Sequence, residues 1–140
     1  MGLADTQRLQ HHMVNDRDVD RFREIMRADV VYEDVPAGRT VKGVDELKEW
    51  LGGWFTAVPD IRIGIEEGTY LEGPGFAFAM VRGRGRHDGP FGPIPATGRP
   101  VDFPVWELLR FDADGKVASG ALMYDQLMLL TQLGVAPAAA

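Results

Sequence analysis

One aspartate interrupts an apolar run close to the C-terminus of the chain. The run reads ALMYDQLMLLTQLG over residues 121–134, and its charged residue is Asp125. Burial of an unpaired charge is costly, so this carboxylate must be solvated, hydrogen-bonded or kept as a proton donor and acceptor. Two interpretations remain open: a helix N-cap, where aspartate is favoured, or a general acid/base group among apolar neighbours.

Glu107 is a second carboxylate whose position could serve chemistry. In the segment FPVWELLRF, period-two alternation places Glu107 on one strand face with Phe103, Val105 and Leu109. A carboxylate on an apolar face is either a catalytic group or the partner of a nearby cation such as Arg110. Both interpretations stay open at this point.

Further candidates stand at the edges of predicted strands. His87 precedes the Gly/Pro-rich loop DGPFGPIPATGRP, where it could contact a substrate or bind only backbone. Tyr32 and Asp34 share a strand face with Val30. We therefore predict catalytic roles for Asp125, His87 and Glu107. Substrate contacts are expected from six other side chains: Tyr32, Asp34, Trp54, Arg86, Trp106 and Met123.

The histidines do not predict a metal site. His11 and His12 are adjacent, so on a helix they face different sides and lack the spacing of four that paired ligands need. The chain contains a single further histidine and no cysteine, which also excludes disulfides and thiol nucleophiles. We expect neither a metal nor another cofactor.

These residues must be positioned by helices that come first and strands that follow. Apolar spacing predicts two helices within 3–28, broken near Asn15, and a third over 44–58. A short strand ends at Pro36. Beyond residue 60 the period changes to two, and long strands are predicted over 76–87, 101–111 and 116–124, before a short helix that ends near Gly134.

This order predicts an α+β fold rather than a parallel βαβ fold. A strongly curved antiparallel sheet, with the N-terminal helices on its concave side, forms a cone that encloses an apolar pocket. Such a pocket is a usual place for a small ligand. The 140-residue length indicates one domain, over 1–134, with a frayed tail at 135–140.

The charge balance excludes some partners. Fifteen Lys and Arg against 21 Asp and Glu give a net charge of −6, which argues against general affinity for nucleic acid or for anionic membranes. The N-terminus lacks the apolar core of a signal peptide, and no apolar segment reaches the length of a membrane span. We expect a cytoplasmic protein.

The last third of the chain closely resembles the SnoaL-like polyketide cyclases, also called ester cyclases, of the nuclear transport factor 2-like superfamily. Three motifs carry the resemblance: HDGPFGPIPATGR, LLRFDADGKV and YDQLMLLTQLG. The N-terminal half matches more loosely, through ADVVYED and GVDELKEWL. The resemblance implies a cone fold and cofactor-free ring closure of a polyketide ester by intramolecular aldol condensation. It also implies that Asp125 is the acid/base group.

The sequence departs from the best-known cyclases in one respect. Those proteins carry a pocket histidine on the strand before the aspartate, whereas this strand reads FPVWELLRF. Two other functions therefore remain open. One is an epoxide hydrolase of the limonene epoxide hydrolase type, in which Arg86, Asp88 and Asp125 would activate water. The other is a small-molecule binding protein without catalysis.

The expected partners follow from the strand faces. The pocket implies a small apolar organic substrate. The long strands carry more apolar side chains than one pocket needs, among them Phe76, Phe78, Trp106 and Leu108. We therefore expect a homodimer or a higher homo-oligomer.

Overall fold

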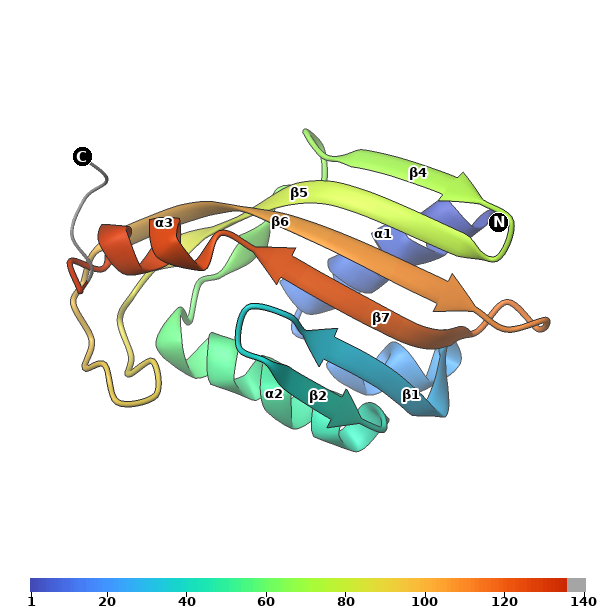
Figure 1. The fold of residues 1–140 in the computed structure, drawn as a ribbon, viewed down its shortest axis with the longest axis horizontal. Coiled ribbons are helices and arrows are strands. Elements are labelled where there is room, and N and C mark those ends of the chain that lie inside the picture. Colours follow the sequence, from blue (N-terminus) through green and yellow to red (C-terminus); the bar gives the residue numbers. More distant parts are fainter. Residues whose placement is uncertain (136–140) are drawn as a thin grey trace.

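The computed structural model describes residues 1–135 as helices packed on one curved sheet (Figure 1). The fold class is α+β, as the sequence predicts. The predicted fraying of the tail at 135–140 falls almost wholly outside the described residues. In chain order the elements are α1 (Leu3–Asn15), the 3₁₀ helix η1 (Val19–Glu24), β1 (Met26–Asp34), β2 (Arg39–Lys42), α2 (Val44–Ala57), β3 (Arg62–Ile63), β4 (Thr69–Gly73), β5 (Phe76–Arg86), β6 (Pro100–Phe111), β7 (Val117–Tyr124) and α3 (Gln126–Gln132).

The sheet is antiparallel except at one pair of strands. Its order is β2-β1-β7-β6-β5-β3, and β4 pairs with β5. The longest ladder joins β5 to β6 in antiparallel register. β1 and β7 pair in parallel, so the expectation of an antiparallel sheet is wrong at this place. The chain between them includes α2 and five strands, which is long enough for a crossover to a parallel neighbour.

The predicted elements are mostly present, with differences among the shortest. α1 ends at Asn15, α2 spans Val44–Ala57, and the three long strands and α3 form as expected. The helical pattern at the N-terminus ends early, because Met26 already pairs with Val117. The strands β2 and β4 were not predicted. Their short, mostly exposed segments show little apolar alternation.

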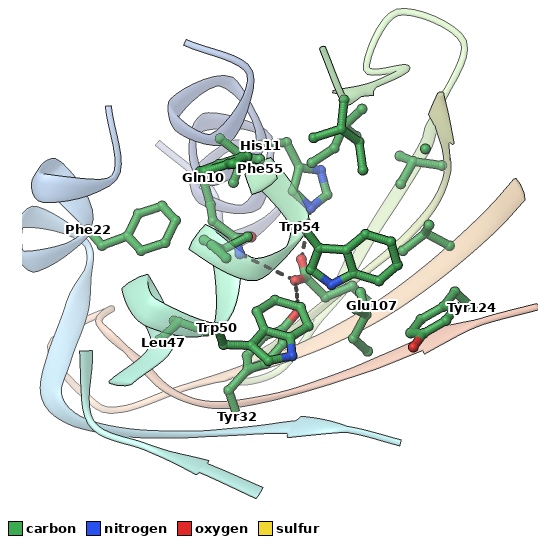
Figure 2. A pocket seen from close by; sticks show the side chains of 18 of the residues that line it. Gln10, His11, Phe22, Tyr32, Leu47, Trp50, Trp54, Phe55, Glu107 and Tyr124 are labelled. Carbon is green, nitrogen blue, oxygen red and sulfur yellow. Dashed lines mark hydrogen bonds and ion pairs between the residues drawn. The ribbon is translucent and has the colours of Figure 1, made fainter. Parts of the chain in front are cut away.

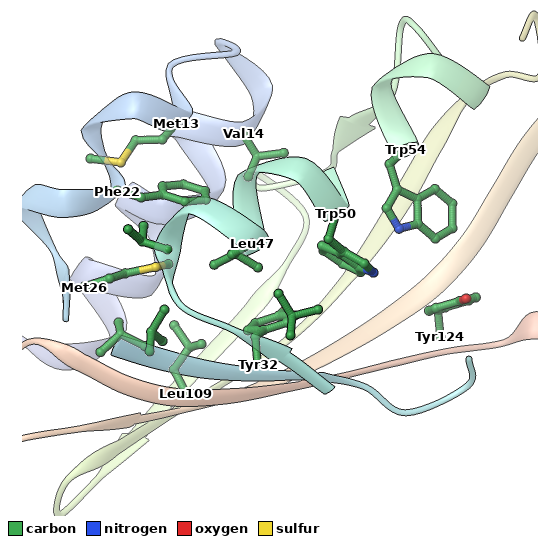
Figure 3. Close-up of a cluster of buried hydrophobic side chains, with 14 of the residues drawn as sticks. Met13, Val14, Phe22, Met26, Tyr32, Leu47, Trp50, Trp54, Leu109 and Tyr124 are labelled. Atoms are coloured by element: carbon green, nitrogen blue, oxygen red, sulfur yellow. The ribbon is translucent and has the colours of Figure 1, made fainter. Parts of the chain in front are cut away.

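The hydrophobic core lies between the helices and one face of the sheet (Figure 3). Val30, Tyr32 and Asp34 all point into it from β1 and are at most 4% exposed, which confirms their predicted common face. From the helices, the core receives Met13, Phe22 and other apolar side chains. The concave face of the sheet is therefore the one that can enclose a site. None of the helices within residues 1–135 is long and apolar enough to cross a membrane.

Candidate active site

A cavity opens between α1, α2 and the concave face of the sheet (Figure 2). Its empty volume is about 740 Å³, a value that includes open space at the mouth. The lining is apolar and rich in aromatic rings. Four polar side chains of the lining gather at one place: Gln10, His11, Tyr32 and Glu107.

Glu107 is the centre of this polar group. The alternation of β6 points its side chain inward between Val105 and Leu109, so the predicted placement on an apolar face is confirmed. The residue is only 3% exposed. The alternative, an ion pair with Arg110, is wrong, because residues three apart in a strand point to opposite faces and Arg110 is exposed.

One turn of α1 supplies three of the donors to this carboxylate. Gln7 Nε2 donates to Oε1 at 3.1 Å, Gln10 Nε2 donates to Oε2 at 3.3 Å, and His11 Nε2 lies 2.8 Å from Oε1. Positions i, i+3 and i+4 of a helix share one face, so these side chains converge on a single point. Gln7 Nε2 also donates to the Glu107 carbonyl oxygen at 3.1 Å, which fixes α1 against β6.

Tyr32 of β1 supplies the fourth donor. Its hydroxyl donates to Oε2 of Glu107 across β7, the strand that lies between β1 and β6. Gly120 of β7 pairs with Tyr32 and makes room for its ring. A Cβ at Gly120 would stand 2.7 Å from the ring, closer than any normal contact. Burial, followed by the charge of Glu107, raises the pKa of Tyr32 well above its ordinary value, so the hydroxyl remains a donor.

The same contacts hold Glu107 in its ionised form. Burial by itself would raise the pKa of this carboxyl group, but the charge of His11 and the hydrogen bonds from His11, Tyr32 and Gln7 outweigh it. The net effect is a lowered pKa. A carboxylate offers about four lone-pair directions, and four side-chain donors occupy them here. The contact from Gln10, at 3.3 Å, is the longest of the three from α1.

Aromatic side chains form the walls beyond the polar group. Asp34 accepts a hydrogen bond from Trp50 Nε1 at 3.0 Å and so fixes one wall of the cavity. Trp54 stacks on Phe103 at 5.7 Å between ring centroids and meets the edge of Tyr124 at 5.3 Å. The rings are locked by one another, which gives the cavity a shape that is set before any ligand enters.

The structure places Asp125 at the N-cap of α3, outside the cavity lining. Its Oδ1 accepts the backbone N–H of Met128 at 2.9 Å, and the side chain is exposed. The desolvated environment expected from the apolar run is therefore wrong: Met123, Leu127 and Met128 are themselves exposed to solvent. The acid/base role that the family resemblance implies for Asp125 stays a prediction.

Several other predicted site residues, catalytic and substrate-binding, also lie outside the cavity. His87 is fully buried, and its Nδ1 accepts the backbone N–H of Thr97 at 3.2 Å, so it braces the loop after β5 rather than lining the cavity. Trp106 and Met123 are half exposed and pair across the convex face of the sheet. Asp34 does not line the cavity, but it accepts a hydrogen bond from Trp50, which does. Tyr32, Trp54 and Glu107 are the predicted residues that the cavity brings together.

The arrangement required by the epoxide hydrolase alternative is not formed. The side chains of Arg86, Asp88 and Asp125 are exposed, and the cavity lining includes none of them. Arg82 and Arg84 pair with Asp102 on the solvated face of the same strand. Among residues 1–135 there is also no cluster of His, Asp and Glu that could hold a metal ion.

Sequence reasoning missed the donors on α1. From the sequence, His11 is assessed only as a possible metal ligand, and no role is predicted for Gln7 or Gln10. One signal was available: Thr6, Gln7, Gln10 and His11 repeat at helical spacing on the face of α1 that is buried. A polar stripe on a buried helix face requires partners, and a glutamate on an apolar strand face can provide them.

The family follows from comparison with known proteins. The model of the SnoaL-like polyketide cyclases matches residues 4–133. The chain belongs to this family. Among curated proteins, no sequence matches the chain. The family assignment confirms the resemblance seen in the C-terminal motifs, and it covers the N-terminal half as well.

Solved structures share the fold at low sequence identity. A proposed SnoaL-like polyketide cyclase from Jannaschia sp. CCS1 is 21% identical, with a TM-score of 0.81 over 96% of this chain and 93% of that one. IdmH, a proposed polyketide cyclase from Streptomyces antibioticus, is also 21% identical, with a TM-score of 0.81 over 96% and 100% of the two chains. A Catenulispora acidiphila protein, described as having a ketosteroid isomerase-like fold, is 17% identical, with a TM-score of 0.75 over 91% and 90%. These similarities establish the cone fold.

Proposed function

We propose that this SnoaL-like protein is a cytoplasmic, cofactor-free cyclase that closes a ring in a bulky, largely apolar polyketide-like ketone or ester. The observation that supports it is Glu107, an ionised carboxylate that is 3% exposed and lies at the surface of an aromatic cavity. Ring closure of the aldol type needs only a base for an α-hydrogen and an acid for an oxygen, so acid/base side chains suffice.

Glu107 is the base in this proposal, and Gln10 controls access to it. At 3.3 Å, the hydrogen bond from Gln10 to Oε2 is the longest of the three from α1 and so the easiest for a substrate to replace. Gln10 also lines the cavity. When a ketone enters, the Gln10 amide turns toward the carbonyl oxygen and leaves a lone pair of Oε2 facing the α-carbon. Gln10 then donates to the oxygen on which negative charge develops.

The reaction then proceeds without net change in protons. Oε2 takes the α-hydrogen as a proton, and the enolate carbon forms a carbon–carbon bond with a second carbonyl of the same molecule. The oxygen of that carbonyl receives the proton back from Glu107. His11 and Tyr32 hold the carboxylate in place throughout. The aromatic walls of the cavity hold the substrate in a folded conformation, so that its two reacting carbons meet.

Two assays test the proposal. The first follows α-hydrogen exchange of β-tetralone in D₂O, which reports proton abstraction alone. The second follows closure of a phenyl-substituted δ-diketone to a cyclohexenone by its ultraviolet absorbance. We expect Glu107→Gln to lower both rates by about 10²–10⁴-fold, the usual value of a general base.

Glu33→Gln is the matched control, because Glu33 is exposed on the convex face of β1. This variant should keep both rates. Equal rates in wild type and Glu107→Gln would contradict the proposal. Binding of β-tetralone without any exchange would instead support a binding protein that lacks catalysis.

A further inference from the structure

The aromatic wall of the cavity contains two polar groups besides those around Glu107. They are the indole N–H of Trp54 and the hydroxyl of Tyr124, on side chains that line the cavity and are only 8% and 5% exposed (Figure 2). Among residues 1–135, neither group makes a hydrogen bond. Neither atom is one of the polar side-chain atoms that are completely shut off from solvent, so a ligand in the cavity can reach them.

The other two tyrosines of the chain use their hydroxyls within the fold. The Tyr32 hydroxyl donates to Glu107, and the Tyr70 hydroxyl lies 2.7 Å from Nδ1 of His11. Tyr124 therefore differs from both in having a hydroxyl with no partner among residues 1–135.

The ring of Tyr124, and not its hydroxyl, holds this side chain in place. The ring meets Trp54 edge-on at 5.3 Å and Phe103 at 6.0 Å between ring centroids. A phenylalanine could make both of these ring contacts. The hydroxyl adds nothing to the packing, but it stands in a fixed position where a ligand could use it.

The register of the sheet relates Tyr124 to the proposed base. Glu107 of β6 faces Leu122 of β7, and Val105 faces Tyr124. Tyr124 is therefore a diagonal neighbour of Glu107 on the concave face, with about 7–8 Å between the two Cα atoms. A bicyclic or larger ligand whose ketone reaches Glu107 can extend along the sheet toward Tyr124.

The two unpaired groups are suited to an oxygen atom that accepts hydrogen bonds. An indole N–H can only donate, and a phenolic hydroxyl can donate to an acceptor. Burial, followed by the charge of Asp34, raises the pKa of Tyr124, so its hydroxyl keeps the hydrogen that it would donate. An apolar part of a ligand placed here would leave both donors without partners, which weakens binding.

We propose that Tyr124 and Trp54 bind a second oxygen of the substrate, at the end remote from the ketone that reacts at Glu107. The inference rests on the proposed function and narrows its substrate class to apolar skeletons that carry an accepting oxygen at both ends. Tyr124 donates a hydrogen bond to the remote oxygen and keeps its proton throughout. Binding at this end determines which α-carbon of the substrate faces the base.

Pairs of ligands that differ in one group test the inference. β-Tetralone with a hydroxyl at carbon 6 or carbon 7 is compared with the analogue that carries a methyl group of similar size at the same carbon. Titration calorimetry measures Kd and requires no turnover. At least one of the two hydroxyl compounds should bind wild type about 3- to 10-fold more tightly than its methyl analogue, the usual effect of one neutral hydrogen bond.

Tyr124→Phe removes the hydroxyl and keeps the ring, so the preference for the hydroxyl compound should fall by about threefold or more. Tyr70→Phe is the matched control, because it makes the same change at a tyrosine outside the cavity lining. This control should keep the preference of wild type. The melting temperature of Tyr124→Phe should stay close to that of wild type, because no contact of the ring is lost.

The outcomes separate this inference from the proposed function. Equal Kd values for the hydroxyl and methyl compounds at both carbons in wild type overturn the inference, even if Glu107→Gln is inactive. A preference that Tyr124→Phe leaves unchanged also overturns it. A preference that Tyr124→Phe loses and Tyr70→Phe keeps supports it. If Glu107→Gln retains full exchange activity, the proposed function fails, whereas the oxygen site is decided by the Kd values alone.

Discussion

Glu107 and Asp125 are carboxylates with opposite surroundings. Glu107 is buried and accepts four side-chain hydrogen bonds, whereas Asp125 is exposed and accepts one backbone N–H at the start of α3. Alternation along β6 was enough to predict that Glu107 points inward. Its partners could not be predicted in the same way, because Gln7 lies 100 residues away in sequence. A local pattern carries no information on which distant helix face will meet it.

Asp125→Asn separates the cap from the acid/base role. Asparagine caps a helix about as well as aspartate, so we expect the melting temperature to change little. Because Asp125 lies outside the cavity lining, we also expect β-tetralone exchange within about twofold of wild type. A loss of about 10²-fold or more at unchanged stability would show that Asp125 is the acid/base group, as the family resemblance implies.

The lowered pKa of Glu107 predicts how stability depends on pH. A carboxyl group whose pKa is lower in the folded than in the unfolded state stabilises the fold above the unfolded value of about 4.3. That contribution is lost as the pH falls through the folded value. The Glu107→Gln variant has no group that titrates at this position, so it should be much less stable than wild type near neutral pH. The difference between the two free energies of unfolding should become smaller below about pH 4.

Urea unfolding of both proteins between about pH 7 and pH 3 provides the measurement. The other carboxylates whose pKa values are lowered, such as Asp112, are common to both proteins, so their effects cancel in the difference. A gap in the free energy of unfolding that stays constant over this range would mean that Glu107 does not ionise differently in the folded protein.

At the scale of elements, the site depends on how closely β1 and β7 pack. Gly120 lies under the Tyr32 ring. A Cβ at Gly120 would also stand 2.9 Å from the Leu109 side chain of β6. The sequence showed a glycine in a strand, KVASGALMY, but not which ring it accommodates. The parallel pairing of β1 with β7 determines that, and it depends on a crossover that local patterns do not specify.

Gly120→Ala should therefore displace Tyr32 from Glu107. The added methyl group has no space, and overpacking of a buried site costs about 1–3 kcal/mol. We expect a lower melting temperature together with slower β-tetralone exchange, because one of the four donors to the carboxylate is lost.

Gly53→Ala is the matched control for that prediction. Beyond the adjoining backbone of α2 itself, no atom lies within 4 Å of a Cβ placed at Gly53, so the close packing that a helical glycine can indicate is not present. Alanine should raise stability by about 1 kcal/mol through helix propensity and leave exchange unchanged. If Gly120→Ala proved as harmless as Gly53→Ala, the Tyr32 contact would not limit the geometry of the site.

At the scale of the whole molecule, the concave and convex faces of the sheet differ in what covers them. The helices cover the concave face (Figure 1). Apolar side chains on the convex face remain exposed. Register places them in two rows across the strands. One row runs through Leu71, Phe78 and Leu108, and the other through Met80, Trp106 and Met123.

We propose that these rows form the interface of a homodimer. Trp106 is 51% exposed and pairs with Met123, which is 50% exposed, so adjacent apolar side chains at this place face solvent. A twofold axis over the rows would bury the same patch on both copies. Light scattering at high micromolar concentration should give twice the monomer mass. Trp106→Lys should shift the protein to a monomer, because a buried lysine at the centre of the interface would be unpaired.

The control for this prediction is an exposed apolar residue off the sheet face. Val35 is 41% exposed in the turn after β1, so Val35→Lys should remain dimeric. Because Trp106 points away from the cavity, Trp106→Lys should also keep the fold and the β-tetralone exchange rate as a monomer. A wild-type protein that is monomeric at these concentrations would contradict the interface. A Trp106→Lys monomer that lost exchange would show that the second copy supports the site through the sheet.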